Sequence, residues 1–107
     1  MPVTARPITE RQFGNQIEHL MLMFGWKFYH VLEQRVYAKR TSKGFPDYVA
    51  VRSGTCLFIE LKSEIGKMTP AQNEWRIELN QVCRFHIGFL YYLWRPSDIE
   101  EAIEVLR

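Results

Sequence analysis

The chain has 107 residues, of which 47% are hydrophobic and 24% are charged, with 14 Lys and Arg against 12 Asp and Glu. This is the size of one domain with enough apolar residues for a core, and the net charge of +2 excludes a histone-like or polybasic protein. The sequence has no apolar run of membrane length, no signal-like stretch in residues 1–12 and no CxxC cysteine spacing. We therefore expect one domain over residues 1–107, in a reducing cytosol and with no membrane partner.

The first predicted element is a helix that begins at Ile8 or Thr9. Thr9 and Gln12 have the spacing of a capping box, and Glu10 suits the positive end of the helix dipole. Apolar residues then recur at helical spacing, and Gly25 is a natural stop. Because Glu10 lies on the same line of this helix as inward-facing residues, we expect its side chain to point toward the core side rather than into water.

A strand and a long basic loop follow the first helix. Residues 26–32 are aromatic and β-branched, as is typical of a strand. Residues 33–44 are polar and include four basic residues, and long loops in compact domains often have a function. The wider segment 35–67 has seven basic and three acidic residues, which favours contact with a polyanion; an ordinary solvated loop is the alternative.

Two apolar strands are predicted over residues 48–52 and 55–61, joined by a Ser-Gly pair. If this pair makes a two-residue hairpin turn, residues whose numbers sum to 107 face each other, which places Asp47 opposite Glu60. Because both strands are apolar at nearly every position, we expect them to be central in the sheet and covered on both faces.

The last part of the chain predicts a helix, a strand and a closing helix. Thr69, followed by Pro and by Gln72 at capping-box spacing, is typical of a helix start. An apolar-aromatic strand follows over residues 88–94, and Ser97 with Glu100 predicts the capping box of a short final helix. The order αβββαβα indicates the α/β class, with one sheet flanked by helices.

The residues that indicate chemistry are Asp47, Glu60 and Lys62. Glu60 and Lys62 leave the same face of a strand, and the hairpin register places the Cβ atoms of Asp47 and Glu60 roughly 5 Å apart. Two buried carboxylates at this distance repel each other, and a hard divalent cation offsets the cost because it prefers oxygen ligands. Lys62 can then orient or deprotonate an attacking water, or stabilise charge on phosphorus. The alternative is an ordinary Glu60–Lys62 ion pair beside a turn.

Motifs along residues 9–107 agree in type and order with one known family. They are Thr9-Glu10-x-x-Phe13, Gly25-Trp26, Tyr29-His30, Gly44-Phe45-Pro46-Asp47, Glu60-Leu61-Lys62, Thr69-Pro70-Ala71-Gln72-x-x-Trp75 and Trp94-Arg95-Pro96-Ser97-Asp98. Together they resemble the VRR-NUC branch of the PD-(D/E)XK nuclease superfamily, in its stand-alone phage and bacterial form. The resemblance implies a restriction-endonuclease-like αβββαβ core with a mixed central sheet flanked by helices, and a short C-terminal helix.

For the centre of the site, the resemblance implies that Asp47 and Glu60 bind a metal ion together with the backbone carbonyl of Leu61. Lys62 matches the catalytic lysine. The implied cofactor is Mg²⁺, with Mn²⁺ as a substitute. Two departures from the family pattern, Tyr48 and Ala50, are ordinary strand variation, whereas residues 33–43 match no family pattern, so the resemblance assigns no substrate contacts there.

The motifs predict that three further residues lie near the acidic pair. Glu10 matches the acid of the first helix that completes the site, directly or through water, and Gln72 matches a glutamine that supports the site or contacts the scissile backbone. Both also have an ordinary explanation, Glu10 as an acid at a helix start and Gln72 as part of a capping box. His30, near the end of its strand, is expected to be a hydrogen-bonded structural histidine.

The expected function is that of a Mg²⁺-dependent endonuclease that hydrolyses DNA phosphodiester bonds. The family association implies branched or Holliday-type DNA as substrate, and the cytosol of a bacterium or of a phage-infected host. One small domain offers little surface for a four-way junction, so a symmetric homodimer with two active sites is expected. For contact with the DNA backbone we expect four basic residues, Lys39, Arg40, Lys43 and Lys67.

Two other functions are compatible with the sequence. One is a non-catalytic nucleic-acid-binding module that keeps the fold for recognition, and the other is a nuclease subunit of a larger repair complex. The first predicts loss of the acidic positions, whereas Asp47, Glu60 and Lys62 are all present.

Overall fold

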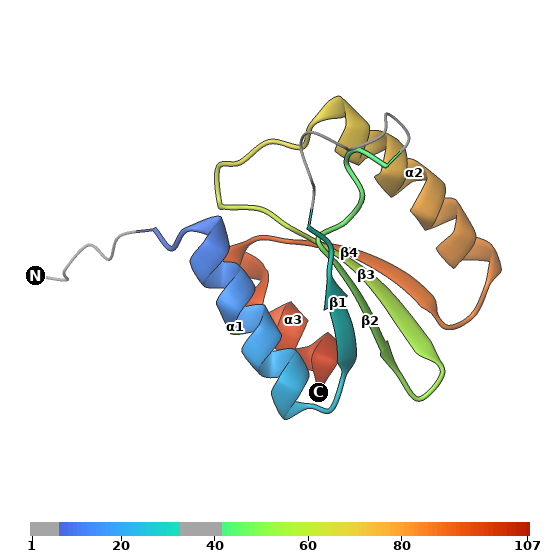
Figure 1. Ribbon diagram of the computed structural model, residues 1–107, viewed down its shortest axis with the longest axis horizontal. Coiled ribbons are helices and arrows are strands. Elements are labelled where there is room, and N and C mark those ends of the chain that lie inside the picture. Colours follow the sequence, from blue (N-terminus) through green and yellow to red (C-terminus); the bar gives the residue numbers. More distant parts are fainter. Residues whose placement is uncertain (1–6, 33–41) are drawn as a thin grey trace, which may run out of the picture.

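The computed structural model describes residues 7–32 and 42–107, and Figure 1 shows how its elements are arranged. In chain order these elements are α1 (Glu10–Met23), β1 (Lys27–His30), β2 (Tyr48–Arg52), β3 (Thr55–Leu61), α2 (Pro70–Phe85), β4 (Phe89–Trp94), the 3₁₀ turn η1 (Pro96–Asp98) and α3 (Ile99–Leu106). This order confirms the predicted α/β fold, with its αβββαβ core and short C-terminal helix. None of the helices in the described ranges is long and apolar enough to cross a membrane.

The four strands form one mixed sheet in the order β1-β2-β3-β4. The pairs β1–β2 and β2–β3 are antiparallel, and β3–β4 is parallel. Both residues of the turn 53–54 have a positive φ, +48° and +82°, as a two-residue hairpin turn requires. The register runs from Arg52 opposite Thr55 to Tyr48 opposite Ile59, which confirms the predicted pairing.

The first strand is shorter than the predicted range 26–32. β1 lies at the edge of the sheet and pairs only with β2, and its last ladder partner is Tyr48, the first residue of β2. Within the described residues, one backbone hydrogen bond extends the pairing beyond this point: the Val31 N–H donates to the carbonyl of Asp47 at 2.7 Å. The strand ends because its partner ends, which the sequence of β1 itself does not reveal.

The helices form two layers, with α1 and α3 on one side of the sheet and α2 on the other (Figure 1). The apolar core lies between the sheet and the α1–α3 layer; its fully buried side chains include Phe13, Ile17, Met21, Leu57, Ile59, Trp94, Ala102 and Leu106. On the opposite face, α2 packs over β4, so the β2 end of that face is open and Val51 is 44% exposed. The prediction that both central strands are covered on both faces is therefore wrong for β2.

The two predicted capping boxes at Thr9 and Thr69 are confirmed, and they have the same geometry. In each, the threonine hydroxyl accepts a hydrogen bond from the backbone N–H of the glutamine three residues later, Gln12 or Gln72, at 3.1 Å. The glutamine Oε1 accepts from the threonine N–H at 2.9 Å. These caps satisfy backbone donors at the start of α1 and α2.

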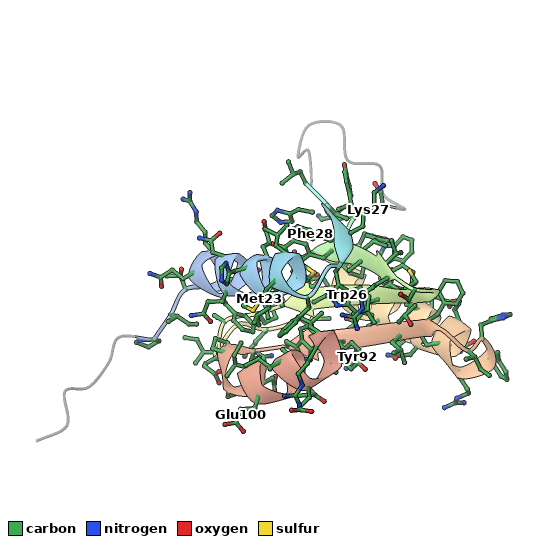
Figure 2. The ribbon with its side chains drawn as sticks, turned by 90° about the horizontal axis from the view of Figure 1, so that it is seen from below. Met23, Trp26, Lys27, Phe28, Tyr92 and Glu100 are labelled. Atoms are coloured by element: carbon green, nitrogen blue, oxygen red, sulfur yellow. The ribbon has the colours of Figure 1, made fainter. Side chains whose placement is uncertain are left out.

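The predicted cap at Ser97 and Glu100 is wrong. The residue before α3 is Asp98, and its side chain makes no cap hydrogen bond to that helix. The Asp98 carboxylate instead accepts from the backbone N–H of Arg95 at 2.8 Å, and the N–H of Ser97 donates to the Glu64 carboxylate. Residues 96–98 form a 3₁₀ turn in front of α3, so Glu100 lies on the outer surface of α3, pointing away from the sheet (Figure 2). The 3₁₀ turn moves the start of α3 past Ser97, so the serine hydroxyl is not at the N-cap position that spacing predicted.

Two arginines stabilise segments in different parts of the molecule, one near the end of β3 and one near the C-terminus. The Arg95 guanidinium donates to the carbonyls of Ser63 at 2.6 Å and Gly66 at 2.7 Å, which ties the loop after β3 to the end of β4. Arg52 lies 4.3 Å from the centre of the Trp26 ring, and the Trp26 Nε1–H donates to the carbonyl of Leu106 at 2.8 Å. Figure 2 shows Trp26 near both α1 and α3.

Candidate active site

Asp47 and Glu60 come together at the end of the hairpin, one residue beyond the last ladder pair of β2 and β3. The Asp47 Oδ2 atom accepts a hydrogen bond from the backbone N–H of Leu61 at 2.8 Å, which holds this carboxylate against β3. Glu60 is only 1% exposed, and its Oε1 atom accepts from the Gln72 side-chain Nε2 at 2.8 Å. One acid is therefore positioned by the neighbouring strand and the other by the helix α2.

Burial raises the pKa of both acids, and the charge of Asp47 raises that of Glu60 further. Removal from water is the largest cause for Glu60, followed by the charge of Asp47, and the pKa of Glu60 rises to about 8. The pKa of Asp47 is raised mainly by burial, with a smaller contribution from the charge of Glu10, although the Leu61 N–H acts in the opposite direction. Glu60 therefore keeps its proton near neutral pH unless another positive charge replaces it.

The donors at this point fit a hard divalent cation. Carboxylate oxygens from two different strands converge at one place, and such oxygens are the ligands that Mg²⁺ prefers. A bound cation would offset the charge of Asp47, which raises the pKa of Glu60. The described part of the chain has no group of three His, Cys, Asp or Glu side chains that could hold a metal ion. The acidic donors that the structure brings together are therefore the Asp47–Glu60 pair.

Lys62 follows on the same face of β3 as Glu60 and is buried, with 8% of its surface exposed. Its backbone N–H donates to the carbonyl of Trp94 at 3.0 Å, which continues the pairing with β4. Its positive charge lowers the pKa of both Asp47 and Glu60, so the ammonium group lies within electrostatic range of them. No ion pair within 4.0 Å joins Lys62 to either carboxylate in the described residues, so the simple Glu60–Lys62 ion pair is not formed.

Glu10 lies at the rim of a cavity rather than against the core. The cavity has a volume of about 470 Å³ and is lined by residues of α1, β1 and β2, including Asp47. Glu10 is exposed because it is the first residue of α1 and extends beyond the packed part of the helix, so the prediction of an inward-facing side chain is wrong. Its charge nevertheless raises the pKa of Asp47 and Glu60, which places it beside the same space.

Gln72 combines the two roles that the sequence left open. Its Oε1 atom completes the cap on Thr69, while its Nε2 atom donates to Glu60. Of the four predicted DNA contacts, Lys43 and Lys67 are exposed, as that role requires. Lys39 and Arg40 lie outside the described residues.

Three polar residues that the site prediction did not include gather beside Asp47, on the wall of the same cavity. The Tyr48 hydroxyl donates to the Glu18 carboxylate, and the His30 ring stacks on the Tyr48 ring with centroids 4.5 Å apart and planes at 17°. Glu18 lies eight residues after Glu10, so the i, i+4, i+8 line of the helix was a usable signal. The His30–Tyr48 pairing gave no local signal, because it joins strands separated by a long connection.

No family model, curated protein or solved structure matches this chain. Fold and site together define an α/β domain in which a half-buried aspartate, a buried glutamate, a buried lysine and a supporting glutamine meet at the end of the central strand β3.

Proposed function

We propose that this chain is a metal-dependent endonuclease that hydrolyses DNA phosphodiester bonds, and that it belongs to the VRR-NUC branch of the PD-(D/E)XK superfamily. The observation that carries the proposal is the convergence of the half-buried carboxylate of Asp47 and the buried carboxylate of Glu60 with Lys62, which is buried one residue beyond the end of β3. Acids whose pKa values are raised by burial, one of which (Asp47) lines a cavity, are typical of functional sites rather than of a stabilising core.

In this proposal Asp47 and Glu60 hold Mg²⁺, or Mn²⁺ as a substitute, together with the backbone carbonyl of Leu61. When bound, the ion lowers the pKa of a water and stabilises charge on the phosphodiester. Glu10, at the rim of the same cavity, takes part through water.

Lys62 and Gln72 act on the reaction in different ways. The Lys62 ammonium is buried and makes no ion pair within the described residues, so it is available to hold the attacking water or to stabilise charge on phosphorus. Gln72 is a positioning residue, because its hydrogen bond fixes the carboxylate of Glu60 from the side of α2. Such preorganisation is what a site needs to act on a transition state.

The substrate in this proposal is branched or otherwise structured DNA, and the working form is a homodimer. The exposed Lys43 and Lys67 flank the site on either side along the chain and suit contacts with phosphates. Two copies related by a two-fold axis would present two sites, as cutting of two strands requires.

The test is cleavage of labelled junction, flap and linear duplex DNA, with Mg²⁺ or with a chelator. We expect cutting only with the metal. Asp47→Ala should abolish cutting and retain binding, whereas Glu74→Ala, which removes an exposed acid of α2, should behave like the wild type. Gel filtration of the same samples tests the dimer.

Two results would contradict the proposal. Cutting that persists in chelator would exclude the metal role of Asp47 and Glu60. Tight binding without cutting of any of the three DNAs would favour a non-catalytic nucleic-acid-binding module instead.

A further inference from the structure

The cavity beside Asp47 has an aromatic wall that the proposed hydrolysis does not use. The rings of Tyr48 and His30 are nearly parallel, at 17° and 4.5 Å between centroids, and Phe28 meets the Tyr48 ring edge-on at 6.0 Å. Tyr48 is buried, and its hydroxyl donates to Glu18 on α1. Two neighbouring rings and one hydrogen bond therefore hold the Tyr48 ring rigidly, and His30 rests on a fixed support.

His30 does not have the surroundings of a structural histidine. Its side chain is 46% exposed, and the described residues give it no hydrogen bond. Its Nδ1 atom lies 3.7 Å from Glu18 Oε2, longer than a hydrogen bond. A structural histidine is normally buried and hydrogen-bonded, so the expectation from sequence is wrong. One face of the imidazole is covered by Tyr48, and the exposed remainder belongs to the cavity that also contains Asp47.

We propose that the exposed face of His30 is a stacking platform for one unpaired nucleobase, next to the phosphodiester at Asp47. The inference rests on the proposed function, because it takes a nucleic acid as substrate. A base on this platform continues the Tyr48–His30 stack, and every base has a π-face that an aromatic ring can receive. The cavity, at about 470 Å³, is within the usual range for a small ligand.

The polar groups around the platform suit a nucleotide. Arg11 and Asn15, one and five residues after Glu10 on α1, line the same cavity, and their side chains make no hydrogen bond within the described residues. A guanidinium group suits a phosphate, and an amide suits the edge of a base.

The platform defines a class of substrate. A base inside a duplex is stacked on both faces, so it must leave the stack before it can meet His30. The preferred DNA is therefore one with an unpaired nucleotide at the cut site, as in a single strand, a flap or an open junction. Continuous duplex should bind more weakly.

β1 offers a matched control for this proposal. Tyr29 precedes His30 in the same strand, is 67% exposed, and points to the opposite face of the sheet, away from the cavity. It is larger and more exposed than His30, but the described residues place no aromatic ring against it. Tyr29→Ala therefore removes an exposed aromatic residue without touching the platform.

The experiment measures binding without cleavage, in a chelator, with a single-stranded oligonucleotide that contains 2-aminopurine, a base whose fluorescence falls when it stacks. Wild-type protein should quench the fluorescence. His30→Ala should weaken binding by at least about fivefold, the lower end of the loss expected for one base–aromatic stack, and should relieve the quenching. His30→Phe should retain both, because it keeps a flat ring, and Tyr29→Ala should resemble the wild type.

Each contrary result overturns the platform. These are equal losses in His30→Phe and His30→Ala, an equal loss in Tyr29→Ala, or equal binding of single strand and duplex. Thermal unfolding of each variant identifies a misfolded protein, and His30→Asn then replaces His30→Ala. Because the assay needs no metal, quenching without any cleavage would contradict the proposed hydrolysis alone, whereas cleavage with unchanged binding by His30→Ala would contradict the platform alone.

Discussion

The two faces of strand β3 bury side chains of opposite character to a similar depth. Leu57 and Ile59 face the core formed with α1 and α3, whereas Glu60 and Lys62 face the side of α2. Apolar groups gain free energy when they leave water, but a carboxylate loses hydration that only partners can replace. One face of β3 therefore stabilises the fold, whereas burial of acids on the other face lowers the stability. Hydrogen bonds hold these acids in position, from Gln72 to Glu60 and from the Leu61 N–H to Asp47.

The largest expected effect separates the two faces directly. Ile59→Ala leaves a cavity in the core and should lower the free energy of unfolding by about 2–5 kcal/mol. Glu60→Gln, one residue later, keeps the shape and removes the charge, so it should cost little stability while it abolishes cleavage. Urea unfolding of both variants in chelator measures the difference. Equal destabilisation by the two substitutions would mean that both faces serve stability.

A smaller effect is expected from pH. In the metal-free protein, folded Glu60 keeps its proton up to about pH 8, whereas the unfolded side chain loses it near the ordinary pKa of 4.5. Between these values the folded state binds more protons, so the free energy of unfolding should fall as pH rises through this window, by on the order of a few kcal/mol.

Glu60→Gln supplies the control for this pH dependence. Denaturant unfolding in chelator at pH 5 and pH 8.5 should show a much smaller change in this variant than in the wild type. If the wild type is as stable at pH 8.5 as at pH 5, ionisation of the buried Glu60 does not lower the free energy of unfolding as expected.

The smallest effect concerns the cap of α2, which supports the acidic face from outside the sheet. Thr69→Ala removes the hydroxyl that accepts from the Gln72 N–H and should cost about 1 kcal/mol of stability. The Thr69 N–H still donates to Gln72, whose Nε2 still reaches Glu60, so the cleavage rate of the folded protein should stay close to that of the wild type. Urea unfolding and a cleavage assay measure both quantities. A large loss of cleavage would show that the cap itself orients Gln72.

Most sequence predictions that depended on residues close together in the chain were correct. The boxes at Thr9 and Thr69 depend on residues three apart, and the β2–β3 register depends on a two-residue turn, so all were predicted correctly. The cap at Ser97 failed although it is local, because residues 96–98 form a 3₁₀ turn and α3 begins after Asp98. Motif spacing alone does not show whether the chain enters a helix directly or through a 3₁₀ turn.

The site shows the same division. The hairpin predicted that Asp47 meets Glu60, but not that α2 brings Gln72 to the same carboxylate or that the Lys62 ammonium lacks an ion pair there. Both depend on how a helix packs on a sheet, which no local pattern specifies. The exposure of Glu10 likewise depends on where α1 ends relative to the sheet.

The sequence by itself determined the order of elements, the hairpin register and the acidic pair with its lysine, because these follow from periodicity, turns and caps within short segments. Only the tertiary structure decided which side chains share a cavity. His30, Tyr48 and Glu18 come from three elements, and their meeting depends on β1 pairing with β2 and on α1 packing beside them. Such contacts depend on how the whole core packs, and residues far apart in the sequence contribute to that packing together.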